Sequence, residues 1–285
     1  MSAAPIAIAR GGWRFASTLP LSGRVGLFFV IAWLALAIVG PSIAPHAVGA
    51  VVSPDVFGAF SASHPLGTDY LGRDMLSRIL YAARFTMGLA LVAALAASLT
   101  GTTFALIAAT AGGWTDEIVS RFMDAFISIP SKMLALVMVA AFGSSVPLLI
   151  LTAAMSYTPG AYRIARSLAV NVKTLEYVQA ARARGEGLAY VARVEILPNM
   201  INPMLADFGL RFVFVVLLLS GMSFLGLGVQ PPHADLGSLV RENISGLFEG
   251  APAVVMPAIA IATLTVGVNL LIDAFSGRAT RATEN

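Results

Sequence analysis

Few side chains in this sequence of 285 residues could carry out covalent or metal chemistry. Cysteine is absent, which excludes disulfide bonds and thiolate metal sites. Histidine occurs only at His46, His64 and His233. No second histidine or carboxylate follows His64 at the spacing of metal ligands, so we predict that it stabilises a turn. We therefore expect neither a metal site nor a catalytic residue.

Two other kinds of chemistry also lack the residues they need. Ser220 and Gly221 lie in an apolar stretch, where no histidine is available to activate a serine nucleophile. Small residues such as Gly221, Gly226 and Gly228 instead favour close packing of helices. Nothing in the chain matches the G-x-x-x-x-G-K-[ST] loop that binds nucleotide phosphates. The chain is therefore expected to be no enzyme and to hold no cofactor of its own.

The composition is typical of a membrane protein. Hydrophobic residues make up 58% of the chain and charged residues 12%, about half the charged share of soluble domains. So little charge cannot cover a surface that faces water. Residues 1–24 carry Arg10, Arg14 and Arg24 and resemble the opening of a signal peptide. However, the uncharged run 25–54 lacks a clear small-residue cleavage site, so we predict a retained first span.

Uncharged windows long enough to cross a membrane recur along the chain. We predict single spans at about 25–44, 85–111, 212–227 with the residues just before it, and 251–272. The window 133–162 contains the breaker Gly143-Ser144-Ser145-Val146-Pro147. We divide it into two spans, the earlier one beginning near Phe126 and burying or snorkelling Lys132. The sequence thus predicts an all-α membrane protein with six transmembrane helices.

The basic residues predict which loops face the cytoplasm, because short cytoplasmic loops carry excess lysine and arginine. The segment 163–207 is rich in basic residues, and six spans place it in the cytoplasm with both chain termini. The expected outer loops, about 45–84 and 229–250, then hold the remaining basic residues, which are Arg73, Arg78, Arg84 and Arg241.

Ionisable groups at the middle of a span are typical of transporters driven by ion gradients. No acidic residue or histidine falls at the middle of a predicted span, and Arg211 is expected at a span entrance. This argues against a secondary transporter. A secondary transporter stays an alternative, and uptake that depends on a proton gradient rather than on ATP would favour it.

The predicted cytoplasmic loop is long, amphipathic and prone to form helix. Alanines and arginines alternate around Ala180, Gly185 permits a bend, and a second helical stretch begins near Leu188 and closes at Pro198. We expect this second stretch to lie along the membrane surface. The apolar face must be covered by the protein, by lipid or by a partner, and it comprises Val178, Ala181, Leu188, Val191 and Ile196. From composition alone, a lipid-bound helix in a structural or assembly protein stays open.

The stretch 176–185, followed by Ile196-Leu197-Pro198-Asn199, resembles the EAA signature of ATP-binding-cassette importer permeases. In that family the motif marks a coupling helix that docks in a cleft of a separate ATPase. Gln179, Glu195 and the pair Glu186-Gly187 depart from the residues that are commoner there. The resemblance implies that the coupling residues are Glu176, Gln179, Ala180, Ala181, Arg182, Arg184, Gly185, Glu186, Leu197 and Pro198.

Two further stretches, 64–78 and 224–232, resemble permeases of the dipeptide, oligopeptide and nickel transport group, and 113–116 is similar as well. The segment His64-Pro65-Leu66-Gly67-Thr68-Asp69 fits the C-type subunit of a two-permease heterodimer. The implied substrate is a peptide or a related small solute, with dipeptides, oligopeptides, nickel chelates, opines and glutathione all open. The short end after Asp273 departs from the group.

The resemblance implies the type I importer permease fold in a bacterial inner membrane. Its implied partners are a second homologous permease, two ATPases that hold ATP and Mg, an extracytoplasmic binding protein and membrane lipid, but no nucleic acid. We expect an N-terminal tail, first span and periplasmic segment over 1–83, the permease domain over 84–275 and a cytoplasmic tail over 276–285. The residues expected to face the binding protein, unless they merely brace the spans, are Asp69, Arg73, Asp74, Arg78 and Gln230.

Overall fold

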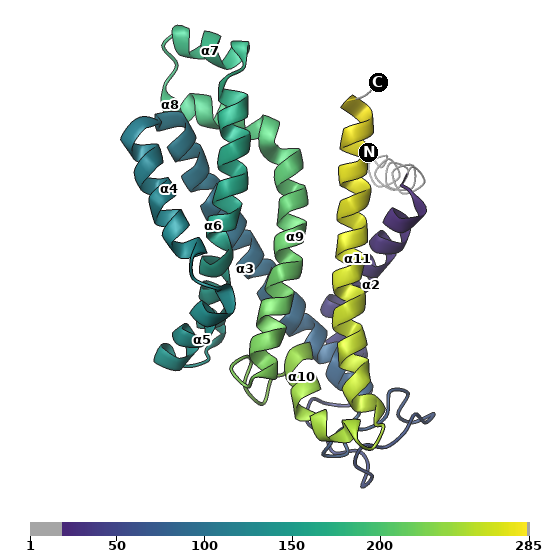
Figure 1. Ribbon diagram of the computed structural model, residues 1–285. Coiled ribbons are helices and arrows are strands. Elements are labelled where there is room, and N and C mark those ends of the chain that lie inside the picture. The colour runs from purple at the N-terminus through teal and green to yellow at the C-terminus, as the bar shows by residue number, and fades with distance from the viewer. Residues whose placement is uncertain (1–18, 284–285) are drawn as a thin grey trace, which may run out of the picture.

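The computed structural model describes residues 19–283, which are helical apart from loops and two isolated β-bridges (Figure 1). Arg10, Arg14 and most of the predicted N-terminal tail lie outside the described residues. A π-helical segment, Val191–Ile196, joins α8 to α9, and a 3₁₀ turn at Ile244–Leu247 follows α10. The helices are α2 (Leu21–Ile43), α3 (Met75–Ala111), α4 (Gly113–Ile127), α5 (Ser131–Phe142), α6 (Val146–Lys173), α7 (Glu176–Ala183), α8 (Leu188–Tyr190), α9 (Leu197–Phe224), α10 (Leu236–Glu242) and α11 (Pro252–Thr283).

Four helices of the described chain are long and apolar enough to cross a membrane. They are α2, α3, the continuous helix Leu188–Phe224 and α11 up to Phe275, and they coincide with the four predicted single spans. A fifth candidate is the pair α4 and α5, which passes the same test only when both helices are taken as one broken span. The all-helical membrane fold is therefore confirmed.

The predicted bounds of the two spans between Phe126 and Tyr162 need correction. Helix α5 has 12 residues, about 18 Å at 1.5 Å per residue, which is too short for a hydrocarbon core of about 30 Å. The chain reaches α5 through α4, with a bend of 82° at the break before Ser131. Helix α6 runs on to Lys173, well past Tyr162. Lys132 is exposed in the first turn of α5, which fits the snorkelling alternative and not the buried one.

The two ends of the molecule differ in their connections (Figure 1). Helix α7 lies at one end, together with the start of α2 and the end of α11; we call this the elbow end. The loop 44–74 and α10 lie at the opposite end, here the loop end. The loop containing Ala180 thus lies at the same end as the start of α2 and the end of α11, and the side of the membrane that this end faces stays a prediction.

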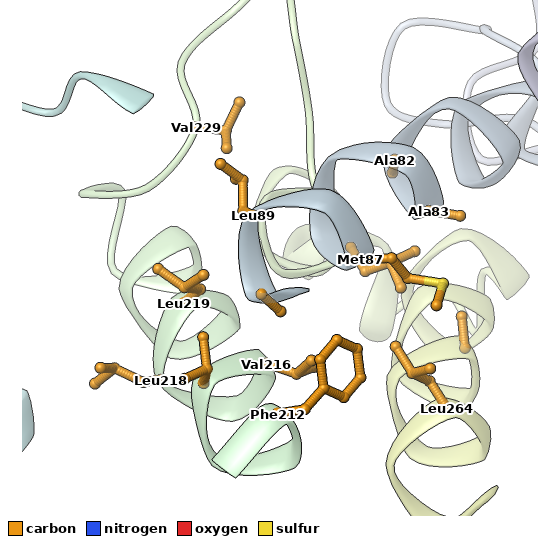
Figure 2. Packing of buried hydrophobic residues seen from close by; sticks show 14 of the residues in the cluster. Ala82, Ala83, Met87, Leu89, Phe212, Val216, Leu218, Leu219, Val229 and Leu264 are labelled. Carbon is orange, nitrogen blue, oxygen red and sulfur yellow. The ribbon is translucent and has the colours of Figure 1, made fainter. Parts of the chain in front are cut away.

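Small residues allow α3 to pack closely against its neighbours. A run of alanines on α3, among them Ala90, Ala97 and Ala105, is fully buried. At Gly101 a Cβ atom would lie 2.5 Å from the Cβ atom of Ala161, so α3 and α6 cross almost backbone to backbone. Larger side chains complete the core between α3, α9 and α11, where Met87, Phe212, Val216 and Leu264 meet (Figure 2).

Proline residues inside the helices leave carbonyl groups that need other donors. Pro41 cannot donate to the carbonyl oxygen of Ala37, and Nε of Arg84 donates to that oxygen instead at 3.3 Å. The Nη2 atom of Arg84 donates to Ile38 at 3.2 Å. Arg84 thus lies inside α3 and ties it to α2, rather than ending a loop as predicted.

Helix α10 is anchored to the bundle through its first residues. The side chain of Asp235 caps the helix by accepting from the backbone N–H of Ser238 at 2.7 Å. It also accepts from the hydroxyl of Ser223 in α9 at 2.6 Å. Burial raises the pKa of Asp235 in spite of these donors. The backbone N–H of Leu236 donates to the hydroxyl of Thr86 in α3, so α10 joins α3 and α9.

Candidate functional site

The amphipathic loop predicted from the sequence forms a sharp helical elbow, which we define as residues 174–196 (Figure 1). Helix α7 ends at a turn in which Gly185 adopts φ = +83°, a conformation that strains other residues. The N–H of Gly185 donates to Arg182 and the N–H of Glu186 donates to Ala181. These two bonds close the end of α7 as a Schellman motif, so the backbone of Glu186 caps the bend.

The apolar face of the elbow is covered by the protein itself rather than by lipid. Four of its five predicted members are fully buried, and only Leu188 is exposed. Three of them belong to a buried cluster with residues of α3, α4, α6 and α9, here the elbow cluster: Ala105, Ala108, Ala109, Met123, Tyr162, Ala165, Ala169, Val178, Val191, Ile196, Met200 and Met204. The elbow is therefore packed onto the bundle and must move with it.

Two basic side chains fasten the elbow to the end of α3. The Nζ atom of Lys173 donates to the carbonyl oxygen of Ala109 at 2.6 Å, and Nη2 of Arg182 donates to Thr110 at 3.1 Å. Carbonyl groups at a helix C-terminus carry partial negative charge and attract cations. Beside them, Arg166 of α6 forms two hydrogen bonds with the carboxylate of Asp116. Lys173 was not among the predicted site residues, because its partner lies 64 residues away in the sequence.

The predicted coupling residues divide into an outward and an inward set. Glu176, Gln179, Ala180, Arg184, Gly185 and Pro198 are exposed, whereas Arg182, Glu186 and Leu197 are partly covered. Ala181 is fully buried and faces the bundle, so it cannot provide contact to a partner. Four further apolar side chains on the elbow are exposed and were not predicted as site residues, namely Leu175, Tyr177, Tyr190 and Val194.

Pro198 does not close the second helical stretch, contrary to the prediction. The helix runs without interruption from Leu188 to Phe224, so α8 leads directly into the membrane helix. The π-helical segment just before Pro198 changes the hydrogen-bond register where the proline cannot donate. The side-chain amide of Asn199 donates to the carbonyl oxygen of Glu195 at 2.7 Å. The elbow is thus continuous with α9.

At the loop end, a buried network joins loop 44–74 to α3 and α10. Asp69 is fully buried and accepts from Nε of Arg73 at 2.6 Å and from Nη1 of Arg78 at 2.7 Å. Its Oδ1 atom also accepts from the backbone N–H groups of Leu71 and Arg73. Glu242 of α10 pairs with both arginines, at 3.3 Å and 2.8 Å. These contacts match the bracing role that was left open, and a binding-protein contact by these charges stays a prediction.

The other residues predicted to face a binding protein differ in exposure. Asp74 is buried, and its carboxylate caps α3 by accepting from the backbone N–H of Ser77. Its oxygens lie 3.7 Å and 3.5 Å from the Nδ1 atoms of His46 and His64, so His64 lies near a carboxylate and a second histidine that its sequence spacing did not indicate. Gln230 is exposed. Within residues 19–283 no cluster of such side chains has the arrangement of a metal site.

An ion pair lies inside α9, where the sequence analysis expected no acidic residue. Asp207 and Arg211 are 7% and 5% exposed, and Nε of Arg211 is 2.6 Å from Oδ2 of Asp207. The loop predicted to end at Asp207 in fact ends near Leu188, so both residues belong to the membrane helix. A candidate span therefore does contain an acidic residue, and the argument against a secondary transporter that relied on its absence no longer holds.

An apolar groove of about 1160 Å³ lies between α2, α3, α9 and α11. Its wall residues include Leu34, Leu91 and Phe208, and the polar side chains in its lining are Arg84 and Asn202. A polar solute in this groove would leave most of its hydrogen-bonding groups unsatisfied, at a cost of several kcal/mol each. The groove is therefore unsuited to carry a polar solute through the bundle.

Comparisons with known proteins agree with this architecture. Residues 101–281 match the family described as "Binding-protein-dependent transport system inner membrane component". The chain is 30% identical to the dipeptide transport system permease protein DppC of Alkalihalophilus pseudofirmus, over 87% of this chain and 82% of that protein. It is 32% identical to the glutathione transport system permease protein GsiD of Pectobacterium atrosepticum, over 75% and 71%.

A solved structure shows the same fold. The crystal structure of an amino acid ABC transporter with histidines contains a chain that aligns with a TM-score of 0.50 and 19% identity. The alignment covers 72% of this chain and 93% of the other.

Proposed function

The chain belongs to the family of binding-protein-dependent transport system inner membrane components, and we propose that it passes peptides or a related small solute through the inner membrane, driven by separate ATPases. As a permease subunit of such an importer it is not an enzyme, in keeping with its relatives. The names of those relatives, dipeptide and glutathione permeases, support a small peptide as substrate. Nickel chelates, opines and oligopeptides are the other members of the proposed class.

The helical elbow is the observation that supports ATP-driven coupling most strongly. Its outward face combines small Ala180 with charged Glu176 and Arg184, which suits docking into a groove of a partner. Its inward face is buried in the elbow cluster. A push on the outward face would therefore be passed to α3, α6 and α9 rather than absorbed by a loose loop. In this proposal ATP and Mg are held by two ATPase subunits and not by this chain.

We also propose the topology and the remaining partners. Helix α6, which is not among the five candidate spans by length and composition, joins α2, α3, the bent pair α4–α5, α9 and α11 to make six passes, with the elbow and both chain ends in the cytoplasm. Basic residues are concentrated at the elbow end, as expected for the cytoplasmic side. Because the groove beside α9 is unsuited to polar solutes, the path is completed by a second homologous permease. A binding protein delivers the solute at the loop end.

Reconstitution in proteoliposomes tests this function. The purified chain is combined with its candidate second permease, ATPases and binding protein, and a radiolabelled dipeptide serves as the probe. We expect uptake that requires ATP on the elbow side and that a proton gradient alone does not support. Uptake driven by the gradient without ATP would establish a secondary transporter instead. Absence of ATP-dependent uptake for dipeptides, glutathione and nickel chelates would contradict the proposed substrate class.

A further inference from the structure

The ion pair of Asp207 and Arg211 is buried within α9, part of a helix that is long and apolar enough to cross the membrane. Two N–H groups of Arg211 hold the carboxylate, Nε at 2.6 Å from Oδ2 and Nη2 at 2.9 Å from Oδ1. Charged groups at such a position are costly and therefore usually have a function. Because Arg211 already occupies both carboxylate oxygens, Asp207 is poorly arranged to carry a proton. A mechanical role fits these contacts better.

The pair also reaches across to the neighbouring helix α6. Nη1 of Arg211 donates to the backbone carbonyl oxygen of Tyr157 at 2.9 Å. Gly160 leaves the space for this contact, because a Cβ atom there would lie 2.9 Å from Nη1 of Arg211. In return, the hydroxyl of Tyr157 donates to the carbonyl oxygen of Phe214 in α9 at 3.1 Å. The two helices are thus joined by hydrogen bonds that run in both directions.

Helices α6 and α9 are the two arms that carry the elbow. Helix α6 ends at Lys173, directly before α7, and α9 continues from the elbow through its π-helical segment. The elbow cluster joins the arms at one end, through residues such as Ala165 and Met200. The contact of Arg211 with Tyr157 joins them deeper in the bundle. A movement of the elbow is passed on to the bundle in full only if α6 and α9 move together.

We propose that Asp207 and Arg211 form a clamp that makes α6 and α9 move as one unit when the elbow is pushed. Arg211 is a positioning residue: it touches neither substrate nor nucleotide, and Asp207 holds its guanidinium in place. The proposal rests on the proposed function, since it concerns the transmission of signals between the ATPases and the loop end. It predicts that an importer without the clamp still assembles, but that binding events at the loop end no longer influence the ATPases.

The test measures how strongly the loaded binding protein stimulates ATP hydrolysis by the full complex in lipid nanodiscs. Stimulation in the wild type is the signature of the proposed function itself, so its absence would count against that function and not the clamp alone. In the double variant Asp207→Leu with Arg211→Met, no charge is left unpaired. We expect assembly by co-purification and basal hydrolysis to persist, with stimulation reduced about tenfold or more.

Two further variants separate the clamp from the ion pair. The exchange Asp207→Arg with Arg211→Asp keeps a pair but moves the guanidinium one helical turn from Tyr157, and we expect the same loss of stimulation. Gly160→Ala keeps both charges and displaces only the end of the Arg211 side chain, so it tests the contact even if the double variants fail to assemble. We expect it to reduce stimulation about threefold to tenfold.

A matched control removes an ion pair that joins no helices. Glu117 and Arg121 in α4 have the same i,i+4 spacing, but they are 3.8 Å apart and largely exposed. Glu117→Leu with Arg121→Met is expected to leave stimulation within about twofold of wild type. Wild-type stimulation in the Asp207/Arg211 double variant, or in Gly160→Ala, would overturn the proposal and leave the pair as a passive packing feature.

Discussion

Replacement of Ala180 with glutamate is expected to abolish most ATP-driven uptake while leaving the membrane bundle folded. Ala180 is exposed on α7 and is absent from the elbow cluster, so the substitution disturbs no internal contact. In the assembled importer the new carboxylate would be buried without a partner, at a cost of about 1–3 kcal/mol. A cost of that size lowers the affinity for the ATPase about 5-fold to 150-fold.

Co-purification of the ATPases and uptake of a labelled dipeptide measure this effect. Ala180→Ser is the matched control, because it keeps a small side chain at the same position, and its uptake is expected to stay near the wild-type level. Thermal melting of the isolated permease variant should be unchanged. If Ala180→Glu kept the ATPases bound and uptake intact, the outward face of α7 would not be the docking surface.

Replacement of Asp69 with alanine is expected to destabilise the loop end by about 3–5 kcal/mol, the usual cost of removing one partner of a buried ion pair. Asp69 is fully buried and accepts from Arg73 and Arg78, and the variant leaves both with Glu242 as their remaining acidic partner. The loop also loses two hydrogen bonds to its backbone. We expect loop 44–74 to detach from α3 and α10.

Melting temperature in nanodiscs and proteolysis of loop 44–74 report on this change. Asp55→Ala is the control, since Asp55 is exposed in the same loop, and a surface substitution of this kind changes stability by about 0.5 kcal/mol or less. Asp69→Asn is expected to fall between the two, because it retains acceptors for the backbone N–H groups. Equal melting temperatures for the Asp69→Ala and Asp55→Ala proteins would show that the network does not hold the loop.

The long apolar helices could be predicted from the sequence because their signal is local. Windows without charge located α2, α3, α9 and α11, and the alanine-rich stretch ending at Gly185 located the turn that closes α7. The same method failed for α4, where exposed charged residues such as Glu117 and Arg121 lower the mean hydropathy of the window. Helix α4 becomes a candidate for a broken span or a re-entrant loop only when it is paired with α5, which no single window detects.

The pairing of charged residues could not be predicted, because the partners are far apart in the sequence. Arg73 and Glu242 are separated by 169 positions. Without the fold, alternating charges over 69–78 fit a surface for a partner as well as a buried network. Asp207 and Arg211 were assigned to a loop and its edge, because charge in a window is normally evidence against a span. The contact of Arg211 with Tyr157 ties the pair to α6, which no pattern within α9 itself indicates.

Cysteine cross-linking shows whether the elbow contacts an ATPase on the cytoplasmic side. The native sequence contains no cysteine, so an Ala180→Cys protein carries a single thiol at the outward face of α7. In the assembled importer we predict a cross-link from this thiol to an ATPase subunit in inverted membrane vesicles. Modification of the thiol by an impermeant reagent from the external side, with no cross-link to the ATPase, would show that the elbow lies outside the cell and does not dock on an ATPase.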